Sequence, residues 1–452
     1  MRFSLIGCMV LSIASMLLAD DFDPFDTKLL VTQQHAALRT CTTTNLNKSL
    51  GLSDVVMSAL CNNPQTNIAW QTSLYQASLV GVSQSAYLPT LSASGSALRS
   101  EGSETKTGNQ ENISVTLSYL LYDFGKRDAT YDNARALLDV ALFSENNTIQ
   151  AVFLSAIQAY YTLFGSNASL EASLEAERSA LASLNAAKTR YTVGTTTPAD
   201  TLQAQTAYSQ AMLNRIQAEG SVKNAQGELA SVLGLMPDTM IKLQTPVLEL
   251  PSDVFEKNIR SLMEEAQRLR PDLMAASAKI KASEASVKAA KAEHLPSFSL
   301  SSTTGHTDTV FNTAQRTSSI GLYVNIPIFT GFNTKYKVQA AQQQLKISEA
   351  EYEKISQDAS LEVYKTYQTL LSETQATRTS SDLVASAQAS YDLAFGRYKA
   401  GVGTILDLLS AQSALASAKQ QHIQSLYTWY ITKASLAKAM GTLDFSTIKG
   451  QP

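Results

Sequence analysis

Two aspartates, Asp200 and Asp407, are the side chains whose sequence surroundings most suggest a shared role. Each comes six residues after a glycine, Gly194 or Gly401, and an arginine–tyrosine pair precedes both glycines. An aspartate in the first turn of a helix is stabilised by the helix dipole, so a purely structural role is one interpretation. A functional charge is the other, and the choice depends on what the surrounding elements build.

The other reactive side chains form no pattern typical of catalysis or metal binding. The histidines are scattered without the spacing of a zinc site; they are His35, His294, His306 and His422. The sequence also has no Gly-x-Ser-x-Gly motif, phosphate-binding loop or His-Glu-x-x-His motif. We therefore expect no enzymatic activity, no metal and no cofactor.

Cys41 and Cys61 are the two cysteines that follow the N-terminal apolar segment. In an oxidising compartment a disulfide between them would contribute roughly 3 kcal/mol. Two separately buried thiols are the alternative. We predict the disulfide, whose role would be structural.

The N-terminus has the features of a secretory signal. Arg2 precedes an apolar run at residues 3–18, and Ala19 is followed by aspartates. This order predicts a signal peptide at 1–19 and an N-terminal segment at 20–51. A Leu-Ile-Gly-Cys string ending at Cys8 is similar to a lipoprotein signal, but it comes too early to be one. No later stretch is apolar enough for a transmembrane helix, so this chain could cross a membrane only as strands.

Composition favours long helices. The 452 residues carry a formal net charge of −3, and 17% are charged, against roughly 25% in a typical globular chain. Gly and Pro supply 20 and 11 positions, so helix breakers are few. The balanced charge also predicts that nucleic acid is not a partner.

The chain is a tandem duplication with an offset of 207 residues. This offset joins several equivalent pairs, namely Pro64 and Pro271, Pro89 and Pro296, Gly194 and Gly401, and Asp200 and Asp407. Gly125 and Gly331 are 206 apart, which predicts a one-residue length difference in a turn. The repeats extend over 52–234 and 259–441, with a linker at 235–258 and a tail at 442–452.

Each repeat begins with a helix, at 67–87 or 273–295, which a Leu-Pro pair ends. Alternation of apolar and polar residues then predicts a pair of strands. The predicted strands are 90–98 and 113–122 in the first repeat, and 297–304 and 318–329 in the second. Ile320, Ile326 and Ile328 fall on one face of the last strand, and aromatic residues stand near the strand ends. In an exported chain, four such strands favour a membrane barrel over a soluble hairpin, and four cannot close a barrel alone.

A very long helix follows each strand pair, at about 127–188 and 336–398. Sixty residues extend on the order of 90 Å, far beyond a globular domain. The apolar positions recur in steps of four and three, as in a coiled coil, and the remaining faces are polar. This pattern predicts a one-helix-thick wall wetted on both sides. An antiparallel coiled-coil hairpin is the alternative for the helices, although it leaves the strands unexplained.

The two tips that carry the aspartates connect these helices to the next ones. Gly194 and Gly401 suit a left-handed C-cap, and Thr197 and Thr404 can cap the following helix.

Taken together, the duplication, the Leu-Pro junctions and the paired Tyr-x-x-Gly-x-x-x-x-x-Asp tips resemble the TolC-like outer membrane factors, the exit ducts of efflux pumps and type I secretion systems. The resemblance covers residues 52–441. It implies a mainly α fold with a membrane β-barrel section. Three chains would form a 12-stranded barrel in the outer membrane and a periplasmic α-barrel of 12 helices. A periplasmic adaptor and an inner-membrane transporter would be the partners.

The resemblance also implies roles for the tips. Asp407 would form a ring of three carboxylates at the constriction, with Tyr398 and Asp200 in the links that hold it closed. Such a ring should favour cations. The adaptor would meet the tips at Gly194, Thr195, Gly401, Val402, Gly403 and Thr404. Family members often have a second aspartate where this chain has Ser410, and some have arginine in place of Gly403, so we expect a less tightly latched gate.

Drugs, metals, dyes and secreted proteins are all possible cargoes, because the pump and the adaptor select them. A periplasmic adaptor or scaffold without a pore is the alternative function.

Overall fold

The computed structural model describes residues 23–32, 48–101, 108–245, 258–309 and 312–445. Contacts divide the chain into two compact units. Unit 1 comprises residues up to 36, 70–143 and 275–353, and unit 2 comprises 37–69, 144–274 and 354–452. Each unit combines segments of both repeats, so the repeats are not separate domains.

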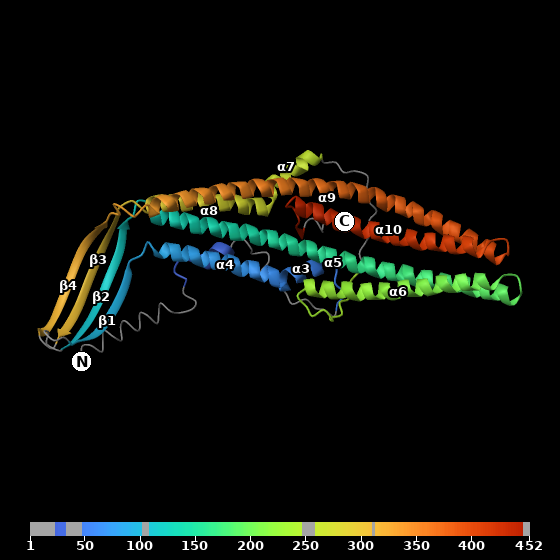
Figure 1. The fold of residues 1–452 in the computed structure, drawn as a ribbon, viewed down its shortest axis with the longest axis horizontal. Helices are drawn as coiled ribbons and strands as arrows, with labels where there is room; N and C mark the ends of the chain where they lie inside the picture. The colour runs from blue at the N-terminus through green and yellow to red at the C-terminus, as the bar shows by residue number, and fades with distance from the viewer. Residues whose placement is uncertain (1–22, 33–47, 102–107, 246–257, 310–311, 446–452) are drawn as a thin grey trace. The chain divides into compact units, whose positions relative to one another are not determined.

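The helices of the two halves repeat without any shift. After α2 (Thr27–Thr32), the first half contains α3 (Leu52–Asn62), α4 (Pro64–Ser85), β1 (Thr90–Ser100), β2 (Gly108–Tyr122), α5 (Lys126–Thr192) and α6 (Pro198–Val232). The second half contains α7 (Ile259–Leu269), α8 (Pro271–Ala292), β3 (Ser297–Thr309), β4 (Asn312–Asn325), α9 (Asn333–Lys399) and α10 (Ile405–Ala439). Each helix from α7 to α10 begins and ends 207 residues after its counterpart (Figure 1).

The predicted one-residue difference near Gly125 and Gly331 is wrong. Both residues of each turn have positive φ, at 54° and 87° for Phe124 and Gly125, and at 60° and 64° for Gly331 and Phe332. The turns therefore have equal length, and glycine and phenylalanine have exchanged places. A phenylalanine in the left-handed region costs on the order of 1 kcal/mol, so each turn carries this strain once.

The strands of unit 1 form one antiparallel sheet in the order β1-β2-β3-β4. The central pair, β2 with β3, joins the two repeats, with Val115 opposite Thr304. β1 pairs only with β2, and β4 only with β3, so both outer edges are free within the described chain. Figure 1 shows the four strands side by side.

The two faces of the sheet differ in polarity. Because side chains alternate along a strand, the register places Leu91, Leu117 and Ile320 on one face. Serines and threonines predominate on the other face, where Thr116 and Thr303 hydrogen bond through their hydroxyl groups at 3.2 Å. The apolar face is open, since Leu91 is 71% exposed and Ile320 is 75% exposed.

The strand boundaries differ from those predicted. Two of the predicted strands end at 98 and 304, but the ladder continues beyond both, with Arg99 opposite Asn109 and His306 opposite Arg316. β4 ends at Asn325 instead of 329, so Ile326 and Ile328 lie outside it. Pro327 has no N–H group to donate to the ladder, which explains the early end.

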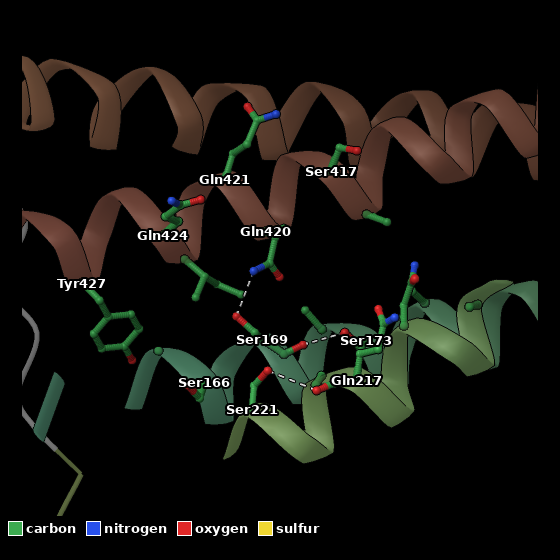
Figure 2. A pocket seen from close by; sticks show the side chains of 18 of the residues that line it. Ser166, Ser169, Ser173, Gln217, Ser221, Ser417, Gln420, Gln421, Gln424 and Tyr427 are labelled. Atoms are coloured by element: carbon green, nitrogen blue, oxygen red, sulfur yellow. Dashed lines mark hydrogen bonds between the residues drawn. The ribbon is translucent and has the colours of Figure 1, made fainter. Parts of the chain in front are cut away.

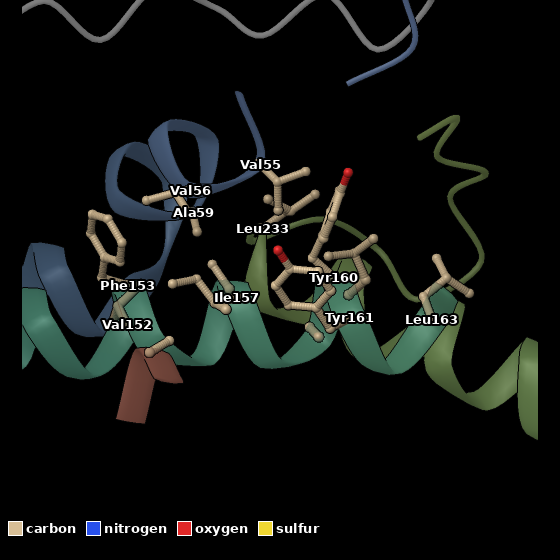
Figure 3. Packing of buried hydrophobic residues seen from close by; sticks show 14 of the residues in the cluster. Val55, Val56, Ala59, Val152, Phe153, Ile157, Tyr160, Tyr161, Leu163 and Leu233 are labelled. Atoms are coloured by element: carbon tan, nitrogen blue, oxygen red, sulfur yellow. The ribbon is translucent and has the colours of Figure 1, made fainter. Parts of the chain in front are cut away.

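The main apolar cluster of unit 2 packs α3 against α5 and the end of α6 (Figure 3). Val55, Val56 and Tyr160 are almost fully buried in it. Tyr160 donates its hydroxyl to the main-chain oxygen of Gln244 at 2.8 Å. This bond anchors the segment after α6 to the long helix.

Residues 63 and 270 occupy equivalent positions in the two repeats, and each donates a hydrogen bond to the equivalent main-chain carbonyl from a different kind of side chain. Asn63 donates to the oxygen of Val232 at 3.0 Å, and Arg270 donates to the oxygen of Ala439 at 3.0 Å. Arg270 is buried and also binds Asp272 and Glu362. The second repeat has therefore built an ion cluster where the first uses one amide.

None of the described helices is long and apolar enough to span a bilayer. Residues 1–19, the predicted signal peptide, lie outside the described ranges. Cys61 is disulfide-bonded. Cys41, its predicted partner, lies outside the described residues, so the pairing stays a prediction.

Candidate functional site

The two tips that join α5 to α6 and α9 to α10 have the same backbone geometry. Gly194 and Gly401 have φ values of 79° and 82°, as predicted for left-handed caps. In the first tip, the N–H of Thr195 donates to the oxygen of Arg190 at 2.9 Å. In the second, the N–H of Val402 donates to the oxygen of Arg397 at 3.0 Å. These bonds close each helix end and hold the turn in a fixed shape.

Thr404 and Asp407 form a capping box at the start of α10. The hydroxyl of Thr404 accepts from the Asp407 N–H at 3.1 Å, and the N–H of Thr404 faces the Asp407 carboxylate at 3.4 Å. The predicted cap at Thr404 is thus confirmed. Thr197 is also the N-cap, but its side chain makes no capping bond and instead lies 3.5 Å from Asp200. Asp407 is exposed, so its carboxylate remains accessible to solvent although it takes part in the capping box.

Tyr398 is the buried centre of the tip region in unit 2. Its side chain is fully buried, against a cluster that includes Leu184, Ile405 and Leu408. The guanidinium of Arg190 lies 4.7 Å from the centre of its ring and donates to its main-chain oxygen at 3.0 Å. Arg190 thus ties the first tip to the second.

The charges of Arg190 and Asp200 both act on the hydroxyl of Tyr398. Burial raises the pKa of the Tyr398 hydroxyl above its ordinary value, and the Asp200 carboxylate adds to this shift. The positive charge of Arg190 opposes it.

A side chain at Gly403 would crowd the turn of the second tip. A Cβ atom there would stand 3.0 Å from the nitrogen of Tyr398 and 3.1 Å from the Cβ of Arg397. The N–H of Gly403 also donates to the oxygen of Arg397 at 3.1 Å. A larger residue at this position would therefore require its neighbours to shift by a few tenths of an ångström.

Both tips present apolar side chains to the surroundings of the chain. Val193 and Val402 are 67% and 70% exposed, and Leu406 is 61% exposed. Gly194, Thr195, Gly401 and Thr404 are exposed as well, whereas Gly403 is half-buried.

A groove of about 940 Å³ runs along α5, α6 and α10 within unit 2 (Figure 2). Its lining, as far as the structure describes the chain, consists of uncharged residues that are mostly serine, alanine and glutamine. Gln420 of α10 donates to the hydroxyl of Ser169 of α5 at 3.1 Å across it. Several of its serines instead bond to their own helix, as Ser173 does to the oxygen of Ser169. A neutral polar surface of this kind attracts neither cations nor anions strongly.

Sequence reasoning missed the contact of Arg190 with Tyr398. The signal was present, because an arginine stands before a tyrosine in both repeats. The described residues contain no group of three or more histidines, cysteines or acidic residues that could hold a metal ion.

Two segments of the chain match the family of outer membrane efflux proteins, at residues 55–235 and 262–442. The chain belongs to this family. Its members are channel proteins of the outer membrane, and the chain is accordingly an outer membrane efflux protein.

Known relatives are similar to this chain over almost its whole length. Protein CyaE of Bordetella pertussis is 31% identical over 414 residues, which cover 89% of this chain and 86% of CyaE. The CmeC outer membrane channel of Campylobacter jejuni superposes with a TM-score of 0.79 at 21% identity, over 88% of both chains. VceC of Vibrio cholerae gives a TM-score of 0.75 at 19% identity, over 86% of this chain and 96% of VceC. The two structures establish the shared fold.

Proposed function

We propose that three copies of this efflux protein close into a ring that serves as the exit duct of a tripartite efflux pump or type I secretion system. The observation that carries this proposal is a four-stranded sheet with two free edges and one open apolar face. In lipid, each unpaired backbone group at a free edge would cost several kcal/mol. Pairing β4 of one copy with β1 of the next removes every edge. Three copies supply 12 strands and leave room for a passage.

The apolar face of the sheet suits contact with lipid. Leu91, Ile113, Ile320 and Leu322 are exposed on it, and the serine and threonine face suits a water-filled interior. Aromatic rings cluster where strands meet helices, with Tyr122 at 4.7 Å and Phe298 at 6.4 Å from Phe124. Such rings are typical of membrane interfaces.

The long helices suit a tunnel in the periplasm. α5 and α9 each have 67 residues, and uncharged polar side chains line the groove beside α5. The exposed valines of the two tips suit a periplasmic adaptor, which would connect the duct to an inner-membrane transporter. Relatives with efflux-pump names, such as the probable efflux pump outer membrane protein TtgC of Pseudomonas putida, support this role.

The ring can be tested by native mass measurement of protein extracted from outer membranes in detergent. We expect a complex of three chains that needs detergent to stay dispersed. A single chain that is dispersed without detergent would instead support a periplasmic scaffold.

We further propose that Asp407 supplies three carboxylates at the tunnel constriction, with Tyr398 and Asp200 holding the tips together. The carboxylate of Asp407 is exposed at the tip, which suits this role. A ring of negative charge in a narrow passage favours cations.

The gate is tested by reversal potentials in a planar bilayer under a salt gradient. In Asp407→Asn, we expect the cation-to-anion permeability ratio to fall toward one. Asp238→Asn, an exposed position after α6, is the matched control and should behave like wild type. Unchanged selectivity in Asp407→Asn would remove Asp407 from the constriction while leaving the duct intact.

A further inference from the structure

A pocket of about 520 Å³ lies in unit 1, where the end of α4 meets the start of α5. This volume is within the range of small-molecule sites, about 300–1,000 Å³. Among the described residues, its lining combines aromatic rings with carboxylates and contains no basic side chain. The rings belong to Phe25, Tyr87 and Tyr131, and the polar groups to Gln84, Asp128 and Asp132. Aromatic faces and carboxylates both attract cations, so this lining favours a positively charged ligand.

The two carboxylates lie on one face of α5, because they are four residues apart in the helix. The hydroxyl of Tyr87 donates to Asp128 at 2.5 Å. Burial and this bond raise the pKa of Tyr87 to about 12, so its hydroxyl stays protonated and remains a donor. Asp132 is exposed and makes no hydrogen bond or ion pair within the part of the chain that the structure describes. Its carboxylate is therefore available to a ligand.

Tyr87 is held in place by two neighbours. The ring of Tyr131 meets it edge-on, with ring centres 6.5 Å apart, and the guanidinium of Arg127 lies 5.0 Å from its centre. Arg127 is already engaged, because it donates to the oxygen of Leu120 at 2.8 Å and pairs with Asp123 at 3.4 Å. This cation thus fixes the wall of the pocket and has its own carboxylate outside the lining.

The amide of Gln84 narrows the class of cation. Its side-chain oxygen is buried and accepts no hydrogen bond from the described residues. A buried acceptor without a donor costs free energy, which an N–H group in the pocket would recover. A primary ammonium has three N–H donors, whereas a quaternary ammonium has none. The spare acceptor therefore favours a primary ammonium.

The second repeat shows that the fold does not require this lining. Adding 207 to the lining residues of α4 and α5 gives their counterparts. For Gln84, Tyr87, Asp128, Tyr131 and Asp132 these are, in order, Lys291, His294, Lys335, Val338 and Gln339. Both carboxylates and both tyrosines are lost, and two lysines bring ammonium groups of the chain itself. Since α8 ends and α9 begins at the equivalent residues, the junction forms without the acidic and aromatic set.

We infer that this pocket binds a primary ammonium group carried on a short alkyl chain. Asp128, Asp132 and the oxygen of Gln84 would accept its N–H groups, and the rings of Phe25 and Tyr131 would enclose the alkyl chain. A soluble amine and the ethanolamine head group of a lipid both offer this chemistry. The site belongs to one chain, so the inference does not depend on how many chains form the duct.

The test has two arms, both on the full chain extracted in detergent and freed of lipid. The first measures binding of butylamine by isothermal titration calorimetry, beside butyltrimethylammonium, which has the same alkyl chain but no N–H group. The second compares, by native mass measurement, the retention of phosphatidylethanolamine and phosphatidylcholine with identical acyl chains. These two lipids also differ only in the methylation of the nitrogen.

Two pocket variants and one control are measured in both arms. Asp132→Asn removes the available carboxylate, and Gln84→Lys introduces the ammonium that Lys291 supplies in the second repeat. Glu349→Gln removes an exposed carboxylate of α9, which lies in the same unit but outside the pocket. Thermal unfolding of each variant shows that the fold is retained.

We expect saturable binding of butylamine to wild type and to Glu349→Gln, and weaker binding of butyltrimethylammonium. Both pocket variants should weaken butylamine binding by about tenfold or more, as expected for hydrogen bonds to a charged group. A preference for phosphatidylethanolamine that both variants lose would identify the lipid head group as a ligand. Butylamine binding without this preference would identify a soluble amine.

Equal affinity for the two alkyl cations would overturn the assignment of a primary ammonium. Absence of selective binding in both arms, or selective binding that both pocket variants retain, would overturn the site itself.

Discussion

Replacing Arg270 with alanine removes the cation at the centre of a buried ion cluster in unit 2. Its guanidinium binds Asp272 through two bonds of 3.0 and 2.7 Å, and Glu362 at 2.6 Å. It also donates to the oxygen of Ala439. The variant would leave two carboxylates without this partner, although Lys438 still reaches Glu362 at 3.1 Å.

The expected loss of unfolding free energy is about 3 kcal/mol. Breaking a buried ion pair by removing one partner typically costs about 3–5 kcal/mol. The lower end applies because the side chain of Glu362 is 39% exposed and is partly screened by solvent. Arg268, an exposed residue in the last turn of α7, is the matched control, and Arg268→Ala should change stability by less than about 0.5 kcal/mol.

The free energy of unfolding should also depend on pH because of this ion cluster. Burial alone would raise the pKa of Asp272 and Glu362, but the hydrogen bonds and charge of Arg270 outweigh it and hold both pKa values below their ordinary 3.8 and 4.5. Groups with lowered pKa stabilise the fold above their ordinary pKa. That contribution is lost as pH falls from about 4.5 through the lower values. Arg270→Ala should show a weaker loss over this range.

The assay is urea unfolding in detergent, followed by the fluorescence of Trp429, which packs against the buried apolar cluster that contains Leu262, Leu370 and Leu436. A Trp70→Phe background removes the other tryptophan. With a slope of about 3 kcal/mol per M, the midpoint should fall by about 1 M.

A variant that also replaces the two carboxylates distinguishes the effect of unpaired charge from the effect of lost packing. Arg270→Asn, Asp272→Gln and Glu362→Ser together give the second repeat the residues that the first has at 63, 65 and 155. This triple variant should recover more than half of the lost stability. A triple variant as unstable as Arg270→Ala, or an Arg270→Ala midpoint equal to wild type, would refute the reasoning.

Three further predictions concern single positions. Gly234→Ala should lower the free energy of unfolding by several kcal/mol, because the new Cβ would collide with the main-chain oxygen of Asn62. At Gly194 the new Cβ meets open space, so Gly194→Ala should lower it by only about 1 kcal/mol, as measured by thermal unfolding. Burial raises the pKa of Tyr160 to about 12, so stability should fall as pH rises from 10 to 12. Tyr160→Phe should flatten that fall, and an unchanged profile would contradict it. Arg190→Gln should lose about 1–2 kcal/mol locally and speed amide exchange around Tyr398 by roughly five- to thirtyfold, measured by mass spectrometry; equal exchange would disprove the tie.

Much of the fold follows from local patterns in the sequence. The offset of 207 residues, the left-handed glycines of the tips and the two long helices all depend on residues close together in the chain. Pro64 and Pro271 could also have marked helix starts, because proline suits the first helical turn. The predicted helices at 67–87 and 273–295 began later than the observed starts at these prolines.

The errors arose where a distant partner decides the structure. Polar residues such as Arg99 and His306 extend the strands because a neighbouring strand pairs with them. The turn at Gly331 was misjudged because its left-handed residues can exchange identity without changing length. The tie from Arg190 to Tyr398 crosses 208 residues of sequence. The arginine–tyrosine pair marks both tips but does not show that they touch each other.

The most direct test of the duct is the ion conductance of the purified, detergent-extracted protein in a planar lipid bilayer. The account predicts discrete steps of uniform size that carry cations in preference to anions. A correctly folded, three-chain preparation that inserts and gives no steps would contradict it.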